Sequence, residues 1–197
     1  MQLDTRSSSF SPRSIVLVAM ILFAVAERLV IFFLPGVLPY NFTPVEAIAL
    51  FGGAYFLDRR LAFFVPLAAM LLSDILIALA LPSDQLYFWY EAVPFTYACI
   101  ALTVFGGFSL SNRVNATRVA GYSFASAVLF FLVSNFGVWL FASRDGSACS
   151  AGLIPCYVAG LPFFKGTLVG TLFWSAALFG GFELMRRRWP TLQPAHA

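Results

Sequence analysis

The sequence predicts an all-α integral membrane protein, a single domain of six transmembrane helices with both termini in the cytoplasm. Of its 197 residues, 60% are hydrophobic and only 11% are charged, whereas an average soluble domain is roughly 25% charged. The apolar residues form six continuous stretches rather than an alternating pattern, which argues against a β-barrel. The composition also argues against a cytosolic enzyme and against a nucleic-acid-binding protein, and the basic residues fall mainly in alternate connections.

The six apolar stretches are each close to the roughly 20 residues that a helix needs to cross a bilayer. The first is a retained helix, because it is too long for a cleaved signal peptide and lacks a convincing cleavage site. The second is short and follows a segment of turn formers, so we expect it to span only with tilt or local thinning. The predicted spans are Ser14–Leu34, Thr43–Leu57, Leu61–Leu81, Tyr90–Phe108, Val119–Ala142 and Leu161–Leu184, a bundle over residues 14–184 with cytoplasmic tails at 1–13 and 185–197.

The basic residues predict the orientation. With a cytoplasmic N-terminus, nine of them lie in inside segments and only Arg144 lies in an outside loop, which is a clear positive-inside pattern. Arg28 and Lys165 lie within or at the edge of spans. The inside residues are Arg6, Arg13, Arg59, Arg60, Arg113, Arg118 and the triplet Arg186, Arg187 and Arg188.

Polar side chains collect in one half of the predicted bundle. Every helix places at least one in its outer half, whereas the inner halves are nearly pure hydrocarbon. Ionisable groups inside a bilayer are costly and default to functional roles, and a channel would need polar groups through the full thickness. The asymmetry therefore favours a pocket that opens outward and binds a small solute. The candidate residues are Arg28, Asn41, Asp74, Tyr90, Glu91, Asn135, Trp139 and Lys165.

Several of these residues also have a structural interpretation. Arg28 and Asp74 can form an ion pair between helices, and Asn135 can hydrogen-bond a neighbouring helix. Glu27 and Arg28 are about 100° apart around the helix, so we expect only one of them to point fully inward.

Residues near the outer interface have similar alternatives. Tyr90 and Trp139 suit an interfacial aromatic belt, and Lys165 can extend its ammonium group toward the interface. Glu46 falls three residues after Thr43, the spacing of a helix capping box, so its role can be structural as well as ligand-binding.

The cysteines and glycines carry weaker signals. Cys99 lies in mid-helix and is expected to pack as a small apolar residue. Cys149 and Cys156 share an outer loop, where a disulfide is possible, and their spacing is not that of a zinc site. Gly166 and Gly170 permit a close helix contact. No nucleotide-binding, metal-site or catalytic motif stands out, so we expect no cofactor and no enzymatic activity.

Four stretches of the sequence resemble a bacterial membrane protein family. The Asn-Phe-Thr-Pro sequence from Asn41 and the Asn-Phe-Gly-Val-Trp sequence from Asn135 are the most specific of its motifs, and the similarity covers most of the chain after Arg28. That family is similar to the substrate-binding S components of energy-coupling-factor (ECF) transporters. The matching stretches lie within Asn41–Phe56, Val65–Asp74, Phe130–Trp139 and Ala151–Phe164.

The resemblance implies a six-helix protein of the inner membrane with a vitamin-type pocket near its outer face. A separate transmembrane coupling protein and two cytoplasmic ATPases supply the energy in such systems. The expected function is therefore substrate capture for micronutrient uptake, and an excess of acids over bases in the outer half favours a cationic or neutral solute. The alternative is a structural or assembly subunit, which predicts tight packing without an outward cavity.

Overall fold

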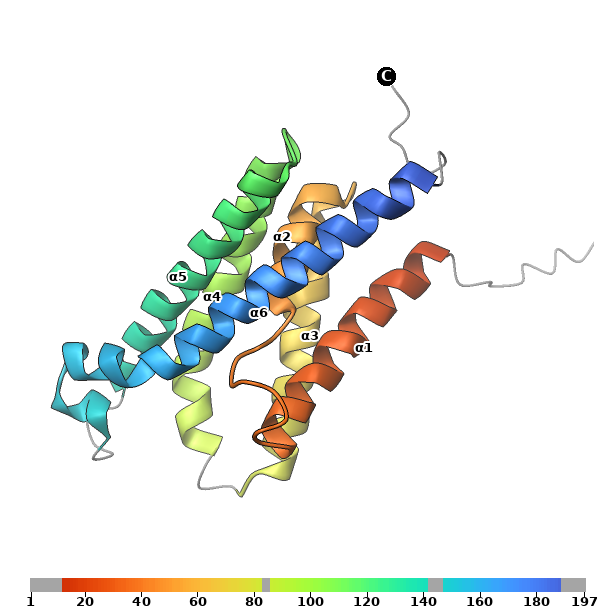
Figure 1. Cartoon of the computed structure of the whole chain (residues 1–197). Coiled ribbons are helices and arrows are strands. Elements are labelled where there is room, and N and C mark those ends of the chain that lie inside the picture. Colours follow the sequence, from red (N-terminus) through yellow and green to blue (C-terminus); the bar gives the residue numbers. More distant parts are fainter. Residues whose placement is uncertain (1–11, 83–85, 142–146, 189–197) are drawn as a thin grey trace, which may run out of the picture.

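Helices account for almost all of the chain that the computed structural model describes, which is residues 12–82, 86–141 and 147–188. Six α-helices and one short 3-10 helix fall within these residues, and no strand does, which confirms the all-α prediction (Figure 1). They are α1 (Pro12–Phe33), α2 (Val45–Tyr55), α3 (Arg59–Ala80), α4 (Leu86–Ser111), α5 (Ala116–Phe141), η1 (Ala148–Ala151) and α6 (Leu153–Arg188).

Five of the described helices are long and apolar enough to cross a membrane. These are α1, α3, α4, α5 and α6, and the outer surface of the bundle carries many large apolar side chains. Leu79 is 80% exposed, and Phe64 and Phe105 are both more than half exposed. Such a surface suits contact with lipid rather than with water, so the chain is a multi-pass membrane protein.

The second predicted span is the exception. Helix α2 has 11 residues, which gives a length of about 16 Å, roughly half of the hydrocarbon thickness. The chain before it, residues 34–44, contains no helix. In Figure 1 this stretch runs from the end of α1 to the start of α2 near the middle of the bundle. We call residues 34–44 the re-entrant segment.

Helix α2 forms the centre of the bundle, since every residue from Val45 to Gly53 is buried. Small residues bring it close to its neighbours. A Cβ atom added to Gly53 would lie 2.8 Å from the Cα of Gly107 on α4, so neither position has room for a side chain. Ile48 and Ala49 of α2 pack in one buried cluster with Val65 of α3. The position of α2 therefore depends on these close contacts.

Helix α6 begins earlier than predicted. The expected start is Leu161, but the helix begins at Leu153 and has 36 residues. Pro155 lies in the first turn, where a missing backbone N–H breaks no helical hydrogen bond. Gly152, which precedes the helix, has φ +134°, a conformation that side chains disfavour. The glycine and the proline therefore mark the beginning of the helix.

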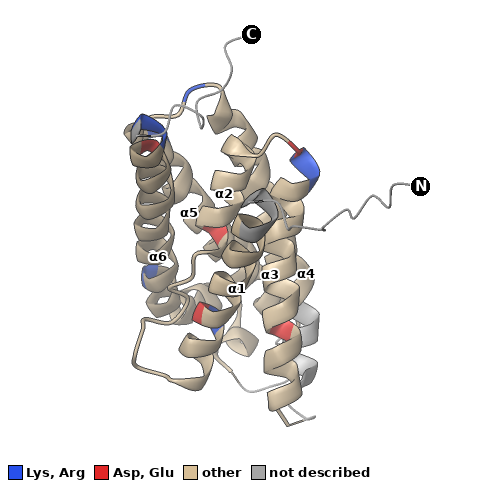
Figure 2. Ribbon diagram, turned by 90° about the vertical axis from the view of Figure 1, so that its right-hand side faces the viewer, with Lys and Arg blue, Asp and Glu red and all other residues tan. Residues whose placement is uncertain are grey.

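Most of the basic residues gather at one end of the bundle. Helix α1 begins and α6 ends at this same end (Figure 1). The arginines at the start of α3, between α4 and α5, in the first turn of α5 and at the end of α6 are coloured blue there in Figure 2. We call this the basic end. The assignment of this end to the cytoplasm remains a prediction. The residues concerned are Arg59, Arg60, Arg113, Arg118, Arg186 and Arg187.

Candidate binding site

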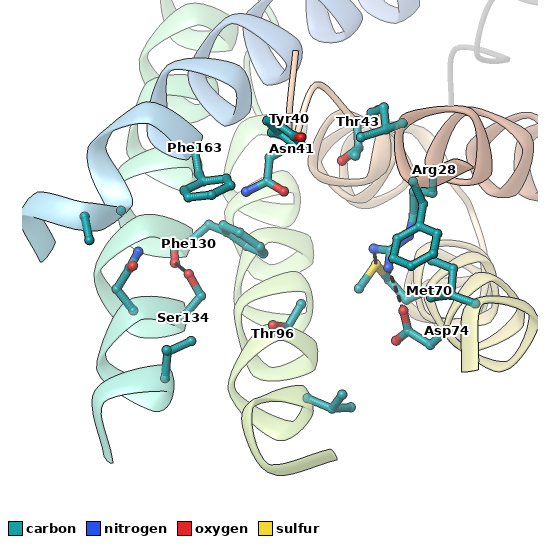
Figure 3. Close-up of a pocket in the computed structure, with 18 of the residues that line it drawn as sticks. Arg28, Tyr40, Asn41, Thr43, Met70, Asp74, Thr96, Phe130, Ser134 and Phe163 are labelled. Atoms are coloured by element: carbon teal, nitrogen blue, oxygen red, sulfur yellow. Dashed lines mark hydrogen bonds and ion pairs between the residues drawn. The ribbon is translucent and has the colours of Figure 1, made fainter. Parts of the chain in front are cut away.

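A cavity of about 710 Å³ opens among the helices in the half of the bundle away from the basic end. Its volume is in the range of pockets that hold small molecules. It is bounded by α1, α3, α4, α5, α6, η1 and the re-entrant segment, and Figure 3 shows most of its lining. Its lining includes Arg28, Tyr40, Asn41, Thr43, Met70, Asp74, Ile77, Thr96, Phe130, Ser134, Asn135, Cys149, Cys156, Gly160 and Phe163.

One wall of the cavity carries an ion pair. The Nη2 atom of Arg28 lies 2.6 Å from Oδ1 of Asp74, and both side chains are largely buried. The hydroxyl of Tyr97 donates to Oδ2 of Asp74 at 2.9 Å, and the other terminal nitrogen of Arg28 contacts the sulfur of Met70. The predicted pairing of Arg28 with Asp74 is therefore present, and it joins α1 to α3.

The spacing of these residues along α3 explains why they share a wall. Met70, Asp74 and Ile77 recur at intervals of four and three residues, which places them on one face of the helix, and all three line the cavity. Sequence reasoning missed Met70 and Tyr97. The signal for Met70 was its position one turn before Asp74, and that for Tyr97 was a hydroxyl inside an apolar span.

The re-entrant segment supplies Asn41 through a tight turn. The N–H of Phe42 donates to the carbonyl of Pro39 at 3.1 Å, and Asn41 has φ +60°. A positive φ at the third position is the signature of a type II turn, and asparagine tolerates it better than most residues. The turn places Asn41 and Tyr40 on the cavity.

Two glycines of α6 make room for this turn. A Cβ atom on Gly166 would collide with the carbonyl oxygen of Tyr40, and one on Gly170 would lie 2.9 Å from the Cα of Phe42. The two glycines of the Gly-x-x-x-Gly motif thus pack against the re-entrant segment. The sequence had suggested a contact with another helix instead. The shape of the cavity depends on this close contact between α6 and the re-entrant segment.

The opposite wall carries two phenylalanine rings among smaller and polar side chains. Phe130 of α5 and Phe163 of α6 lie across the cavity from Arg28 in Figure 3, and the rings of Tyr40 and Phe163 have centroids 5.7 Å apart. Asn135 lines this wall, but its amide nitrogen donates within its own helix to the carbonyl of Phe131 at 2.8 Å. Its amide oxygen packs where Gly160 of α6 leaves space.

A disulfide links Cys149 and Cys156, and both residues line the cavity. It connects η1 to the first turn of α6. The sulfur of Cys156 lies 3.6 Å from the backbone carbonyl of Asn135 on α5. The bond therefore anchors η1 against the wall of the cavity, whereas Cys99 is free and buried.

A second cavity of about 40 Å³ adjoins the first, and five residues line both. It reaches Glu46, which is only 3% exposed. The predicted capping box is not formed. The hydroxyl of Thr43 donates to Glu46 at 3.3 Å, but Pro44 already has helical dihedral angles at the cap and no side chain caps α2. Because Pro44 occupies the cap position, the Thr43 hydroxyl hydrogen-bonds the carboxylate of Glu46 and does not cap a backbone N–H of α2.

Glu27 is buried inside the bundle, whereas its neighbour Arg28 is only partly buried. Glu27 is 7% exposed, and neither of its carboxylate oxygens has a hydrogen-bond partner among the described residues. The buried face of α1 includes Ala24, Val25 and Ile31. This face is wide enough to take in Glu27, while the long Arg28 side chain reaches round to Asp74.

Four of the eight predicted site residues line the main cavity, namely Arg28, Asn41, Asp74 and Asn135. Trp139 and Lys165 do not.

Trp139 is partly buried and stacks on Phe136 with ring centroids 5.5 Å apart, and Lys165 is exposed. Tyr90 and Glu91 belong to α4, but their side chains lie outside the described part of the structure. Within that part, no group of three or more His, Cys, Asp or Glu residues could hold a metal ion.

Comparison with known proteins finds one family. A model described as a family of unknown function, DUF6580, matches residues 8–192. No curated protein matches the chain, and no solved structure does.

Proposed function

This chain belongs to DUF6580, a family of unknown function, and we propose that it is a membrane-embedded binding protein that captures a small solute. The observation that carries the proposal is the cavity of about 710 Å³, with an ion pair on one wall and aromatic rings on the other. In this role the protein is the substrate-binding subunit of a micronutrient uptake transporter, similar to an ECF S component.

The cavity favours binding over a purely structural role. A structural subunit would use its polar residues to hold helices together in a tightly packed bundle. Here Asn41, Thr96 and Ser134 line open space beside the Arg28–Asp74 pair. Small-molecule sites combine an apolar lining with a few polar groups in this way.

The direction of capture follows from the charges. Under the positive-inside rule the basic end marks the cytoplasmic side. Both termini are then cytoplasmic, and the cavity opens toward the outer side of the inner membrane. In this topology α2 and the re-entrant segment together complete a sixth crossing. The disulfide at the cavity is consistent with an oxidising outer compartment.

Energy for release of the solute would come from partners. The sequence has no P-loop, so a transmembrane coupling protein and cytoplasmic ATPases would supply it. Purification from native membranes with a mild detergent, followed by identification of bound subunits, tests this part of the proposal. Their absence would leave a binding protein that acts alone.

The binding function itself is tested by native mass spectrometry for a co-purified small molecule. A Thr96→Phe variant places a ring in the cavity, whereas Ala98→Phe adds the same ring at an exposed position of the same helix. We expect the first variant to lose the bound molecule and the second to keep it. Retention by both variants, or repeated absence of any bound molecule from the wild type, would favour the structural alternative.

A further inference from the structure

The ionisable groups around the two cavities do not balance. Three carboxyl groups lie near Arg28: Asp74 forms an ion pair with it, Glu46 lines the small cavity with it, and Glu27 precedes it on α1. Among the described residues that line either cavity, Arg28 is the only basic one. In the lining of the two cavities this single guanidinium stands against two carboxyl groups, those of Asp74 and Glu46, while Glu27 lies outside the lining.

The guanidinium of Arg28 already forms an ion pair with one of the three carboxyl groups. Arg28 pairs directly with Asp74 at 2.6 Å, and Tyr97 adds a hydrogen bond to the same carboxylate. Glu46 receives one long hydrogen bond from Thr43, and Glu27 receives none from the described residues. An uncompensated carboxylate in an apolar interior is costly, and such residues in membrane proteins mark functional sites.

The geometry points to an organic cation as the ligand of this site: a small molecule with a positively charged nitrogen group and an apolar or aromatic body. This inference rests on the proposed function. The charged group lies beside Glu46, where the small cavity adjoins the large one. Asn41 and Thr43 line the same place and offer oxygen acceptors for N–H donors.

The wall that carries the phenylalanine rings suits the rest of such a molecule. Phe130 lines both cavities, so its ring borders the charged group as well as the body, and a cation near an aromatic face is stabilised. Phe163 and Tyr40 continue the apolar surface beyond it. An anion fits less well, because its natural partner, Arg28, is occupied by Asp74.

Three probes of matched size test the sign of the ligand's charge. 2-Phenylethylamine, 2-phenylethanol and phenylacetate share one body and carry positive, zero and negative charge at neutral pH. The purified wild-type protein is titrated with each probe by calorimetry, and its Tm is recorded in parallel. We expect the amine to bind at least about tenfold more tightly than the other two.

Variants locate the charge. Glu46→Gln removes the carboxylate at the small cavity, and Glu183→Gln makes the same change beside Arg186 and Arg187 near the end of α6. We expect the first variant to lose the preference for the amine and the second to keep it. Glu27→Gln, at a residue that is not part of the cavity lining, should weaken the preference less.

The outcomes separate the two proposals. Equal or tighter binding of the alcohol or the acid by the wild type overturns the cation inference and leaves the binding function standing. No binding of any probe, together with no co-purified molecule, overturns both. Because the wild-type comparison decides the sign, the inference stays testable when Glu46→Gln fails to fold.

Discussion

The guanidinium of Arg28 lies 2.6 Å from the carboxylate of Asp74 and joins α1 to α3 across a largely buried contact. Removing one partner leaves the other charge without compensation, and for buried pairs this costs about 3–5 kcal/mol. We expect Asp74→Asn and Arg28→Gln each to lower the free energy of unfolding by up to that amount.

The double variant should be less destabilised than the sum of the two single variants, by about 0.5–3 kcal/mol. Unfolding in mixed detergent micelles measures all four proteins. Strict additivity would show that the pair contributes no coupling. Tyr97→Phe is a milder variant that removes only the hydrogen bond to Asp74. We expect it to lower the free energy of unfolding by about 1 kcal/mol.

A methyl group on Gly166 should disturb the cavity from outside it. The added Cβ meets the carbonyl oxygen of Tyr40, so the re-entrant segment must shift, at a cost of about 1–3 kcal/mol. We expect Gly166→Ala to lower the Tm and to weaken solute binding together.

Gly180→Ala is the matched control on the same helix, because no atom lies within 4 Å of its added Cβ. Alanine in a helix interior is better than glycine by roughly 0.5–1 kcal/mol, so this variant should be as stable as the wild type or slightly more stable. Normal solute binding by Gly166→Ala would show that the close contact between Gly166 and the re-entrant segment does not shape the cavity.

Reduction of the Cys149–Cys156 disulfide should loosen the cavity rim. The bond closes a short loop, with a sequence separation of 7, and loops of this length gain about 2–3 kcal/mol from closure. We expect a reductant to lower the Tm of the wild type and of Cys99→Ser, since Cys99 is not part of the bond.

The double variant Cys149→Ser with Cys156→Ser should begin at the lower Tm and show no response to the reductant. Scanning calorimetry or tryptophan fluorescence provides the Tm. A wild-type Tm that does not change on reduction, with loss of the bond verified by mass, would show that the rim is stable without it.

The orientation is testable with reporter fusions. A fluorescent protein that folds only in the cytoplasm should be bright after the last residue and after Asn112, which lies in the α4–α5 connection. Alkaline phosphatase, which needs the outer compartment, should be active after Ser147. The reverse pattern would place the cavity on the cytoplasmic side and would remove the case for uptake from outside.

The sequence predicts the long helices well because each is a continuous apolar run. The third and fifth spans were expected at 61–81 and 119–142, and the helices occupy 59–80 and 116–141. The start of α6 escaped prediction because Pro155 reads as a helix breaker, although a first turn accepts proline. The turn formers at 34–44 predict a loop, but nothing local says that this loop enters the bundle.

The site was predictable only in its polar part. Arg28, Asp74 and Asn135 could be found because polar groups are rare in apolar helices, and Asn41 because it lies just before a predicted span. The phenylalanine rings of the opposite wall could not be found, because 23 phenylalanines are spread over the chain and their patterns do not distinguish a cavity from a lipid-facing surface. The buried state of Glu27 depends on how α1 packs, which no local pattern encodes.

The re-entrant segment contains three prolines, Pro35, Pro39 and Pro44, among its 11 residues. Backbone outside a helix normally brings one amide hydrogen per residue that must be satisfied, and hydrocarbon offers it no acceptor. Proline has no such hydrogen. The three prolines therefore remove three backbone donors from the connection between α1 and α2, where no helical hydrogen bonds are available. This lowers the desolvation cost of placing an irregular chain inside the bundle.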